Sequence, residues 1–399
     1  MSPLTTNQRY LALFGTIAVV IAVGIVGSFA SRPALSEPAS GTIGVESGTE
    51  TCGAGWTEPH AGLSRFAVHN TTIAGEEVYL EGAKNQLVYG ELEGLGPSAT
   101  HDLSAVLANG SYRFVCLPAD LPPAYGQVVT INGAHSVADP TPGVKIVTAA
   151  DLIAPDKQYH AWVSGRLPIL ASDVLSLARS VATGDIPAAR AAWLSAHLEY
   201  ESLGAAYGAF GDLDAAINGV PRSGSTALTD PNLTGFHRLE ALLWGGAAAT
   251  AIMPSADRLV TDVNRLQSAF ATAQIPPLDI GLRAHEILEN AIQFELTGAT
   301  DAGSATNIAT IGANLVGTRE ALAPLEPLLA TRYPALASTK RWLDRAATLV
   351  ASYHRPDGSW TPLAELTRPQ RQALNAALDE SVQLLAPVAT ITDPRLAPQ

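Results

Sequence analysis

The periodicity of the sequence changes once, at the segment Asp139-Pro-Thr-Pro-Gly143. Before it, short stretches of alternating polar and apolar residues are separated by turn residues, and after it long alanine- and leucine-rich stretches prevail. A period of two is typical of strands, whereas apolar residues three and four apart are typical of helices. A chain of 399 residues is also longer than one hydrophobic core usually serves. We therefore expect a β domain followed by an all-α domain.

The β domain is predicted to cover residues 49–136. About seven short strands separated by turns are typical of a small β-sandwich. Asn109-Gly110 is a strong signal for a hairpin turn. The clearest alternating segments are 65–70, 77–81, 86–92, 111–116 and 127–132.

The helical domain is predicted to cover residues 155–390, after a linker at 137–154. Glycine, proline or aspartate marks nearly every junction between its segments, and Asp185-Ile-Pro187 is a good helix start. About eight helices without a strand pattern indicate a helical bundle. The expected helices are 156–183, 186–209, 231–244, 255–273, 277–297, 307–329, 334–353 and 368–385.

The start of the chain carries an export signal. Residues 10–30 are uncharged and mostly apolar, and Arg9 in the short segment 1–9 precedes them. About 20 apolar residues are enough to cross a bilayer, and the positive flank places the rest of the chain outside the cytoplasm. An uncleaved membrane anchor and a cleaved signal peptide are both compatible with this pattern. Residues 31–48, rich in Ser, Pro, Gly and Glu, are predicted to be a flexible linker.

Charge and cysteine content narrow the function classes. The chain has 24 Lys and Arg against 37 Asp and Glu, a formal net charge of −13. Nucleic-acid binding requires basic patches, so this balance argues against it. Cys52 and Cys116 are the only cysteines. In an exported protein such a pair more often forms a disulfide than stays reduced.

Paired histidines and glutamates recur in the predicted helices. His237 and Glu240 are three residues apart, so one helical turn presents them on the same side. His197 and Glu201 are four apart, as are His285 and Glu289. Imidazole and carboxylate together are suitable ligands for iron and related cations. We interpret His237 and Glu240 as metal ligands assisted by Glu201, and His197, His160 and Asp212 as surface or structural residues.

The β segment resembles the cupredoxin-like domain that precedes the helical domain in EfeO-type iron-uptake components. A blue-copper site is excluded, because the residues after Cys116 are Leu-Pro-Ala-Asp, without the His or Met that such a site needs. The resemblance implies a metal site made of Cys52, Cys116, Glu77 and Glu91 or Glu93. A Cys52–Cys116 disulfide is the alternative, and both require the two cysteines to be close together. The matching features are Cys52, Phe66-Ala-Val-His-Asn70, Glu77-Val78, Glu91-Leu-Glu93, Gly110-Ser-Tyr112 and Cys116.

The helical segment resembles the imelysin-like domain, whose hallmark is Gly-x-His-x-x-Glu. Here that motif is Gly235-Phe-His-Arg-Leu-Glu240, and the similarity extends over Tyr200-Glu201, 210–214 and Asp357-Gly358. For the whole chain the resemblance implies a component that binds ferrous or ferric iron outside the cytoplasm. It further implies delivery of that iron to a membrane permease, with a haem peroxidase as another partner. Copper and zinc are alternative cargoes.

The chain departs from this family at positions that matter for the cation. A second glutamate three residues after Glu201 is Gly204 here, and an expected aspartate is Asn218. A histidine-containing segment of typical members is replaced by Ala, Thr and Ser in 301–311. These changes remove carboxylates from the expected site. We expect Glu289 to supply part of what is missing.

Two other functions compete with iron binding. One is a metal-dependent peptidase, the class after which imelysin-like proteins were named. His285-Glu-Ile-Leu-Glu289 is one residue from the zinc-peptidase motif, but Glu289 stands where the second histidine ligand is required. The other is an adhesion or polymer-binding module on the same scaffold. Binding without catalysis is therefore the function that we expect.

Overall fold

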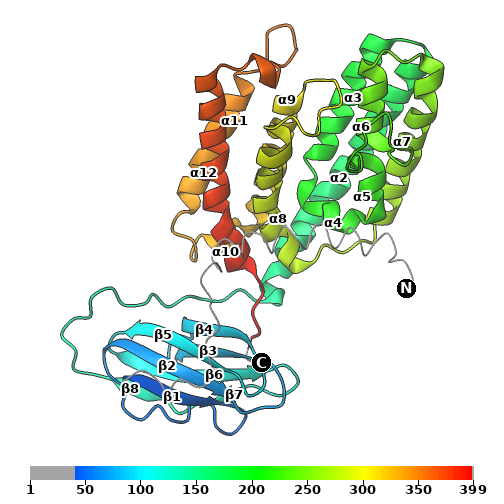
Figure 1. Ribbon diagram of the computed structural model, residues 1–399. Helices are drawn as coiled ribbons and strands as arrows, with labels where there is room; N and C mark the ends of the chain where they lie inside the picture. Colours follow the sequence, from blue (N-terminus) through cyan, green and yellow to red (C-terminus); the bar gives the residue numbers. More distant parts are fainter. Residues whose placement is uncertain (1–40, 398–399) are drawn as a thin grey trace.

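Two separate sets of buried apolar side chains divide the chain into a β domain and a helical domain. The computed structural model describes residues 41–397, and Figure 1 shows the strands gathered at one end and the helices at the other. One buried cluster contains Val45, Phe66 and Phe114 from the strands, and the largest one contains only residues of 147–388. The predicted order of a β domain before an all-α domain is confirmed.

The β domain is a sandwich of two sheets. In the first sheet the order is β1-β2-β5, with β1 parallel to β2 and β5 antiparallel to it. In the second sheet the order is β4-β3-β6-β7, and β8 also pairs with β6. The strands are β1 (Thr42–Ser47), β2 (Gly62–Asn70), β3 (Glu76–Gly82), β4 (Val88–Leu95), β5 (Thr100–Leu107), β6 (Gly110–Pro118), β7 (Ala124–Tyr125) and β8 (Val129–Ile131).

Aromatic rings fill the space between the two sheets. Trp56, Phe66 and Phe114 meet edge to face, with ring centroids 5.1–5.7 Å apart. Successive strand residues point to opposite faces, so Val78 and Cys116, which are paired across β3 and β6, both face this core. Large apolar rings packed in this way supply most of the burial that a small sandwich needs.

The outer face of the second sheet carries the contacts between the domains. Tyr79 and Leu117 on this face pack with Ile146 of the connecting segment. The tail after the last helix runs beside the connecting segment, where the Arg395 amide donates to the Val147 carbonyl at 2.8 Å. Figure 1 shows this tail descending from the bundle to the sandwich. Both connections of the helical domain thus lie against one face of the β domain.

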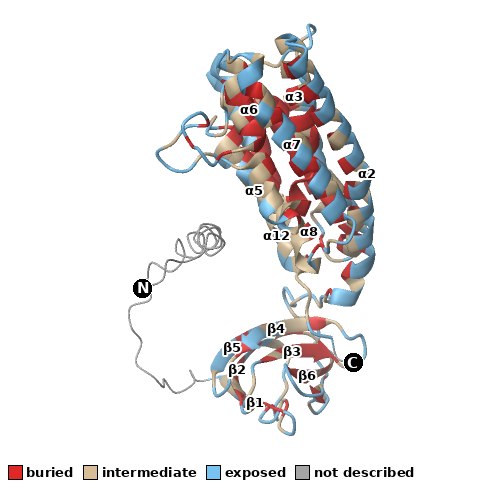
Figure 2. Cartoon of the chain, turned by 90° about the vertical axis from the view of Figure 1, so that its right-hand side faces the viewer, coloured by how far each residue is buried: buried red, intermediate tan, exposed pale blue. Residues whose placement is uncertain are grey.

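The helical domain is built on long helices that pack lengthwise (Figure 1). Figure 2 shows that their inward faces are buried and their outward faces exposed, the pattern of helices around a common core. The long helices are α2 (Ala149–Ala182), α3 (Ile186–Glu201), α6 (Gly235–Trp244), α7 (Ala249–Phe270), α8 (Pro277–Asn290), α9 (Asn307–Leu322), α11 (Leu336–Ala351) and α12 (Arg368–Thr392). The short ones are η1 (Gly204–Ala206), α4 (Tyr207–Phe210), α5 (Asp212–Asn218), η2 (Ala291–Glu295), η3 (Ala323–Leu325), α10 (Glu326–Leu329) and η4 (Leu363–Glu365).

Several boundaries differ from the predicted ones. Strand β1 begins at Thr42, inside the segment 31–48 that was predicted to be a linker. Helix α2 begins at Ala149, inside the predicted linker 137–154, because Thr148 and Asp151 form a capping box that the proline-based boundary overlooked. The predicted anchor or signal at 10–30 lies outside the described residues. Within 41–397, none of the helices is long and apolar enough to span a bilayer.

Candidate functional site

The candidate site starts at the first turn of α6, which carries His237 and Glu240. The helix begins at Gly235, whose φ of +78° is unfavourable for any residue with a Cβ. His237 is 4% exposed and Glu240 is 2% exposed. Their side chains lie on the same face, with Nδ1 of His237 3.5 Å from Oε2 of Glu240. The predicted pairing on one turn is therefore present, inside the domain.

Glu240 is held as a charged carboxylate. Burial by itself would raise its pKa, but contacts from His237 and Ser304 outweigh burial and hold the pKa at about 2. The Ser304 amide donates to Oε1 at 3.0 Å. A carboxylate that is ionised and nearly inaccessible is suited to a cation, because buried charges need an opposite charge or a metal.

His197 on α3 faces the same place. Helices α3 and α6 pack side by side (Figure 1), and the rings of His197 and His237 are 5.6 Å apart, edge to face. His197 is 4% exposed, so of the two predicted alternatives, a surface or a structural residue, only the structural one agrees with its burial. Its Nε2 lies 3.2 Å from Oε1 of Glu201, an ion-pair distance, yet neither ring nitrogen has a hydrogen bond of acceptable angle. We treat the contact with Glu201 as electrostatic for that reason.

A small cavity lies between these side chains. Its volume is about 10 Å³, close to the room that one water molecule or bare cation occupies. Within 41–397, no three His, Cys, Asp or Glu side chains already stand in a metal-ligating arrangement. His237 and Glu240 contact each other. The lining residues are Trp193, His197, His237, Glu240, Glu295, Thr300, Asp301, Ser304, Thr306, Asn307 and Thr310.

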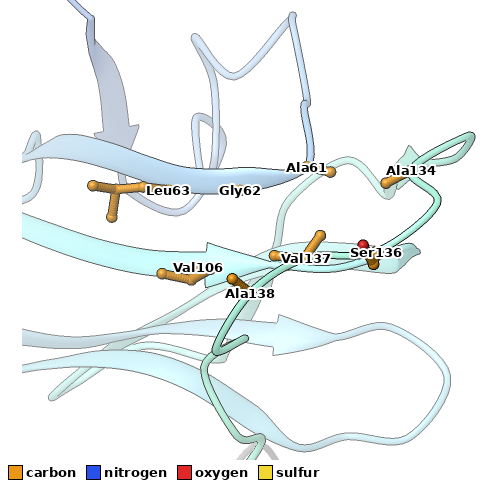
Figure 3. A pocket seen from close by; sticks show the side chains of 8 residues that line it. All are labelled: Ala61, Gly62, Leu63, Val106, Ala134, Ser136, Val137 and Ala138. Carbon is orange, nitrogen blue, oxygen red and sulfur yellow. The ribbon is translucent and has the colours of Figure 1, made fainter.

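A larger hollow lies in the other domain. It measures about 570 Å³ and is open to the outside, between the start of β2, the end of β5 and the segment 134–138 (Figure 3). Its lining is alanine, glycine, valine and leucine with one serine, and none of these side chains titrates. The larger pocket therefore has no titratable side chain in its lining. The smaller polar cavity in the bundle is the better candidate site.

A family model described as imelysin, of peptidase family M75, matches residues 156–388. This stretch holds the cavity and most of the helical domain. The chain belongs to the imelysin family.

The imelysin-family chain is also similar to curated relatives over both domains. It is 26% identical over 327 residues to "Iron uptake system component EfeO" of Yersinia pestis, covering 82% of this chain and 84% of the relative. It is 27% identical over 328 residues to the protein of the same name from Escherichia coli O157:H7, covering 82% and 85%. The resemblance to EfeO-type components thus extends well beyond the imelysin match.

Glu201 occupies a different position in this imelysin domain from the one expected. Its Oε1 accepts from Asn218 at 2.7 Å and its Oε2 accepts from Asn314 at 2.9 Å. Burial would raise its pKa, but His197 and the two amides lower it to about 2. Glu201 is not among the residues that line the cavity. Glu201 instead contacts His197, which does line the cavity. The expectation that Glu201 is a direct ligand is corrected accordingly.

The two departures near Glu201 have physical explanations. A Cβ at Gly204 would lie 2.8 Å from Cγ1 of Ile287, so a larger residue requires Ile287 to move. Asn218 donates a hydrogen bond to Glu201 where a carboxylate would repel it. The surroundings of Glu201 in this imelysin domain therefore hold one carboxylate, which His197 and two neutral amide donors stabilise.

Glu289 is not brought to the site. It lies on α8 beside His285, with a separation of 3.6 Å between Oε2 and Nδ1, and its side chain is 35% exposed. Neither residue lines the cavity. The structure therefore does not place Glu289 where it could replace a missing carboxylate at this cavity.

The four expected ligands of the β domain do not converge. Cys52 and Cys116 form a disulfide with an S–S distance of 2.11 Å, so their thiolates are not available to a metal. Glu77 and Glu91 lie on the opposite face of the sheet, with Tyr79. Glu77 accepts from the Leu396 amide at 3.1 Å, and Glu91 pairs with Arg395 at 3.0 Å. These carboxylates bind the tail, and the thiolate alternative is excluded in this structure.

Glu295 is a site residue that the sequence analysis missed. It ends the π-helical turn η2 and is 8% exposed, and its side chain lines the cavity. The only signal in the sequence is an isolated glutamate in the apolar context Ile292-Gln-Phe-Glu-Leu296. Because a glutamate in an apolar context is rarely buried without a partner, this pattern could have indicated a functional residue.

Proposed function

We propose that this protein is the extracytoplasmic iron-binding component of an uptake system, with His237 and Glu240 as ligands of the transported cation. Two observations support the proposal: the polar cavity in the bundle and the similarity to EfeO-type iron-uptake components. The cavity is the observation on which the proposal depends. The ionised carboxylate of Glu240 and the imidazoles of His237 and His197 line a volume suited to one ion.

The donor set fits the proposed cargo. Iron accepts hard oxygen ligands together with imidazole nitrogen, and both kinds are present. Copper and zinc have overlapping preferences, so they are the natural competitors in a titration. His237 and Glu240 contact each other, so a bound cation would replace that contact with bonds to both side chains.

The proposed function also requires release. The two proposed ligands come from a single helical turn. We propose that the recipient is a membrane permease and that a haem peroxidase acts in the same system.

Peptide hydrolysis is less well supported. A peptidase must place a scissile bond against its metal and its base, whereas both His237 and Glu240 are nearly inaccessible and the cavity holds about one small ion. A chain of amino acids does not fit that volume. The name of the family therefore says little about this site.

Isothermal titration of the purified full chain tests the proposal. Fe²⁺ under anaerobic conditions, Fe³⁺, Cu²⁺ and Zn²⁺ are titrated into the wild type and into the double variant His237→Ala/Glu240→Gln. We expect iron binding in the wild type and a loss of at least tenfold in the variant. The matched control is His285→Ala/Glu289→Gln, a similar pair that does not line the cavity. Equal affinity in the wild type and in the site variant, or no binding by the wild type, would overturn the proposal.

A further inference from the structure

Glu295 lines the cavity because the helix widens into a π-helical turn directly after α8. The segment η2 (Ala291–Glu295) is a π-helical turn, and the Leu296 amide donates to the Ala291 carbonyl five residues earlier at 2.9 Å. Such a turn accommodates one more residue than an α-helical turn and is often found at functional sites. The added residue changes the direction in which the next side chain points. Here it places Glu295 among the cavity residues.

The Glu295 carboxyl group has no positive partner in the described part of the chain. Its Oε1 accepts from the Thr300 hydroxyl at 2.6 Å and its Oε2 accepts from the Asn307 amide at 2.8 Å. Both donors are uncharged. Buried carboxylates normally have a cationic partner or a metal. Burial and the charge of Glu201 raise the pKa of Glu295, and its two neutral donors and the more distant His197 do not offset them.

His197 is a second group whose bonding is incomplete. Its buried Nδ1 has no partner, and its Nε2 has only the electrostatic contact with Glu201 at 3.2 Å, although the ring lines the cavity. The ring stacks on Trp193 at a centroid distance of 4.7 Å, which fixes its orientation. Buried polar atoms normally have a hydrogen-bond partner or a bound ion. A cation in the cavity would provide that partner.

We propose that His197 and Glu295 complete the cation site begun by His237 and Glu240. The proposal rests on the proposed function and extends its ligand set to two imidazoles and two carboxylates, contributed by α3, α6 and η2. A mixed nitrogen and oxygen set selects divalent first-row transition cations over Ca²⁺ and Mg²⁺, which prefer oxygen ligands.

The test compares two new variants with the wild type by anaerobic Fe²⁺ titration of the full chain. Glu295→Gln removes the charge and keeps the shape, and His197→Phe keeps a ring to stack on Trp193. We expect each to weaken Fe²⁺ binding by at least about tenfold. We also expect the wild type to prefer Fe²⁺ over Ca²⁺ and Mg²⁺ by a much larger factor. Glu286→Gln is the matched control, since Glu286 on α8 is also partly buried but lies near Arg283, 3.6 Å away.

The absorption spectrum of bound Co²⁺ gives a second readout, because its visible bands change when a ligand is lost. Glu295→Asp keeps the charge with a shorter reach, so partial recovery of affinity is expected if Glu295→Gln binds weakly. Thermal unfolding confirms that each variant is folded, and Glu295→Asp replaces Glu295→Gln if the latter is not.

The outcomes separate the two proposals. Wild-type affinity and an unchanged Co²⁺ spectrum in Glu295→Gln and His197→Phe, with weakened binding in His237→Ala/Glu240→Gln, overturn the extended ligand set and leave the proposed function standing. No binding by the wild type, or binding that does not depend on His237 and Glu240, overturns both.

Discussion

The His197 imidazole and the Glu201 carboxylate are one turn apart on α3, and Nε2 lies 3.2 Å from Oε1 inside the helical domain. Burial would lower the pKa of His197, but the carboxylate of Glu201, with Glu240 and Glu295 further away, raises it. The same contact helps to lower the pKa of Glu201. The charge of each group is thus maintained by the other, and the stability of the domain depends on pH.

Acid is expected to destabilise the protein through Glu201. Its pKa is about 2 in the folded state against an ordinary value of 4.5, so the folded state prefers the ionised form. This contribution is complete above pH 4.5 and is lost as the pH falls towards 2. One pKa unit is worth about 1.4 kcal/mol, so the loss is on the order of a few kcal/mol. Urea unfolding at pH 3, 5 and 7 measures it.

The variant Glu201→Gln is expected to show a smaller loss of stability between pH 5 and pH 3, because it has no carboxyl group to protonate. At pH 7 it is expected to be less stable than the wild type by about 1–3 kcal/mol, since a buried charged hydrogen-bonding network is disturbed. Glu289→Gln, a change at a partly exposed position, serves as the control. Identical pH dependence in Glu201→Gln and the wild type would contradict the assignment.

Removing the disulfide is expected to destabilise the β domain without affecting the cation site. Cys52 and Cys116 are 64 residues apart, and the entropy of closing such a loop corresponds to about 4 kcal/mol. We expect Cys52→Ala/Cys116→Ala to unfold at lower urea, with unchanged Fe²⁺ affinity because the cavity lies in the other domain. A higher metal stoichiometry in the reduced wild type than in the oxidised protein would argue for thiolate ligands instead.

Gly235 is expected to be indispensable for the start of α6. A Cβ there would lie 2.0 Å from the Ile217 carbonyl oxygen, in addition to the unfavourable φ of +78°. We expect Gly235→Ala to cost more than the roughly 1–2 kcal/mol of left-handed strain alone, and to weaken cation binding by displacing His237. Chemical unfolding measures the first effect and titration the second.

Gly246 provides the control for this prediction. Its φ is +75°, but an added Cβ would have nothing within 4 Å. The loss of stability in Gly246→Ala therefore measures the cost of the left-handed backbone conformation alone, without a steric clash. Equal destabilisation by the two substitutions would show that the contact with Ile217 has no energetic importance.

Arg395 is expected to fix the orientation of the two domains. Its guanidinium lies 3.0 Å from Glu91 and 2.6 Å from Glu93, and its side chain is only 9% exposed. Because Arg395→Ala would leave these carboxylates facing each other, the tail is expected to detach from the sheet. Small-angle scattering should then show a larger radius of gyration, and hydrogen exchange faster exchange at the Leu396 amide. Arg368→Ala at an exposed position is the control, and unchanged scattering in Arg395→Ala would contradict the prediction.

The order of the domains and the class of each follow from periodicity, which is local. Strands β2, β3 and β6 lie where alternation predicted them, and the pairing of His237 with Glu240 on one turn follows from helical geometry. The boundaries at β1 and α2 were missed because they depend on pairing with β2 and on a capping box. The sandwich and the bundle were predictable, whereas the cupredoxin-like character of the sandwich remains a prediction.

The sequence by itself determined that two domains would form and that one turn of α6 would carry an imidazole and a carboxylate, because residues a few positions apart share a face by geometry alone. Only the tertiary structure decided which other groups meet them. Glu295 depends on the widened turn after α8, His197 on the packing of α3 against α6, and Glu91 on an arginine 304 residues later in the chain. The physical reason is that such contacts depend on how whole helices and sheets pack, and no local spacing encodes that arrangement.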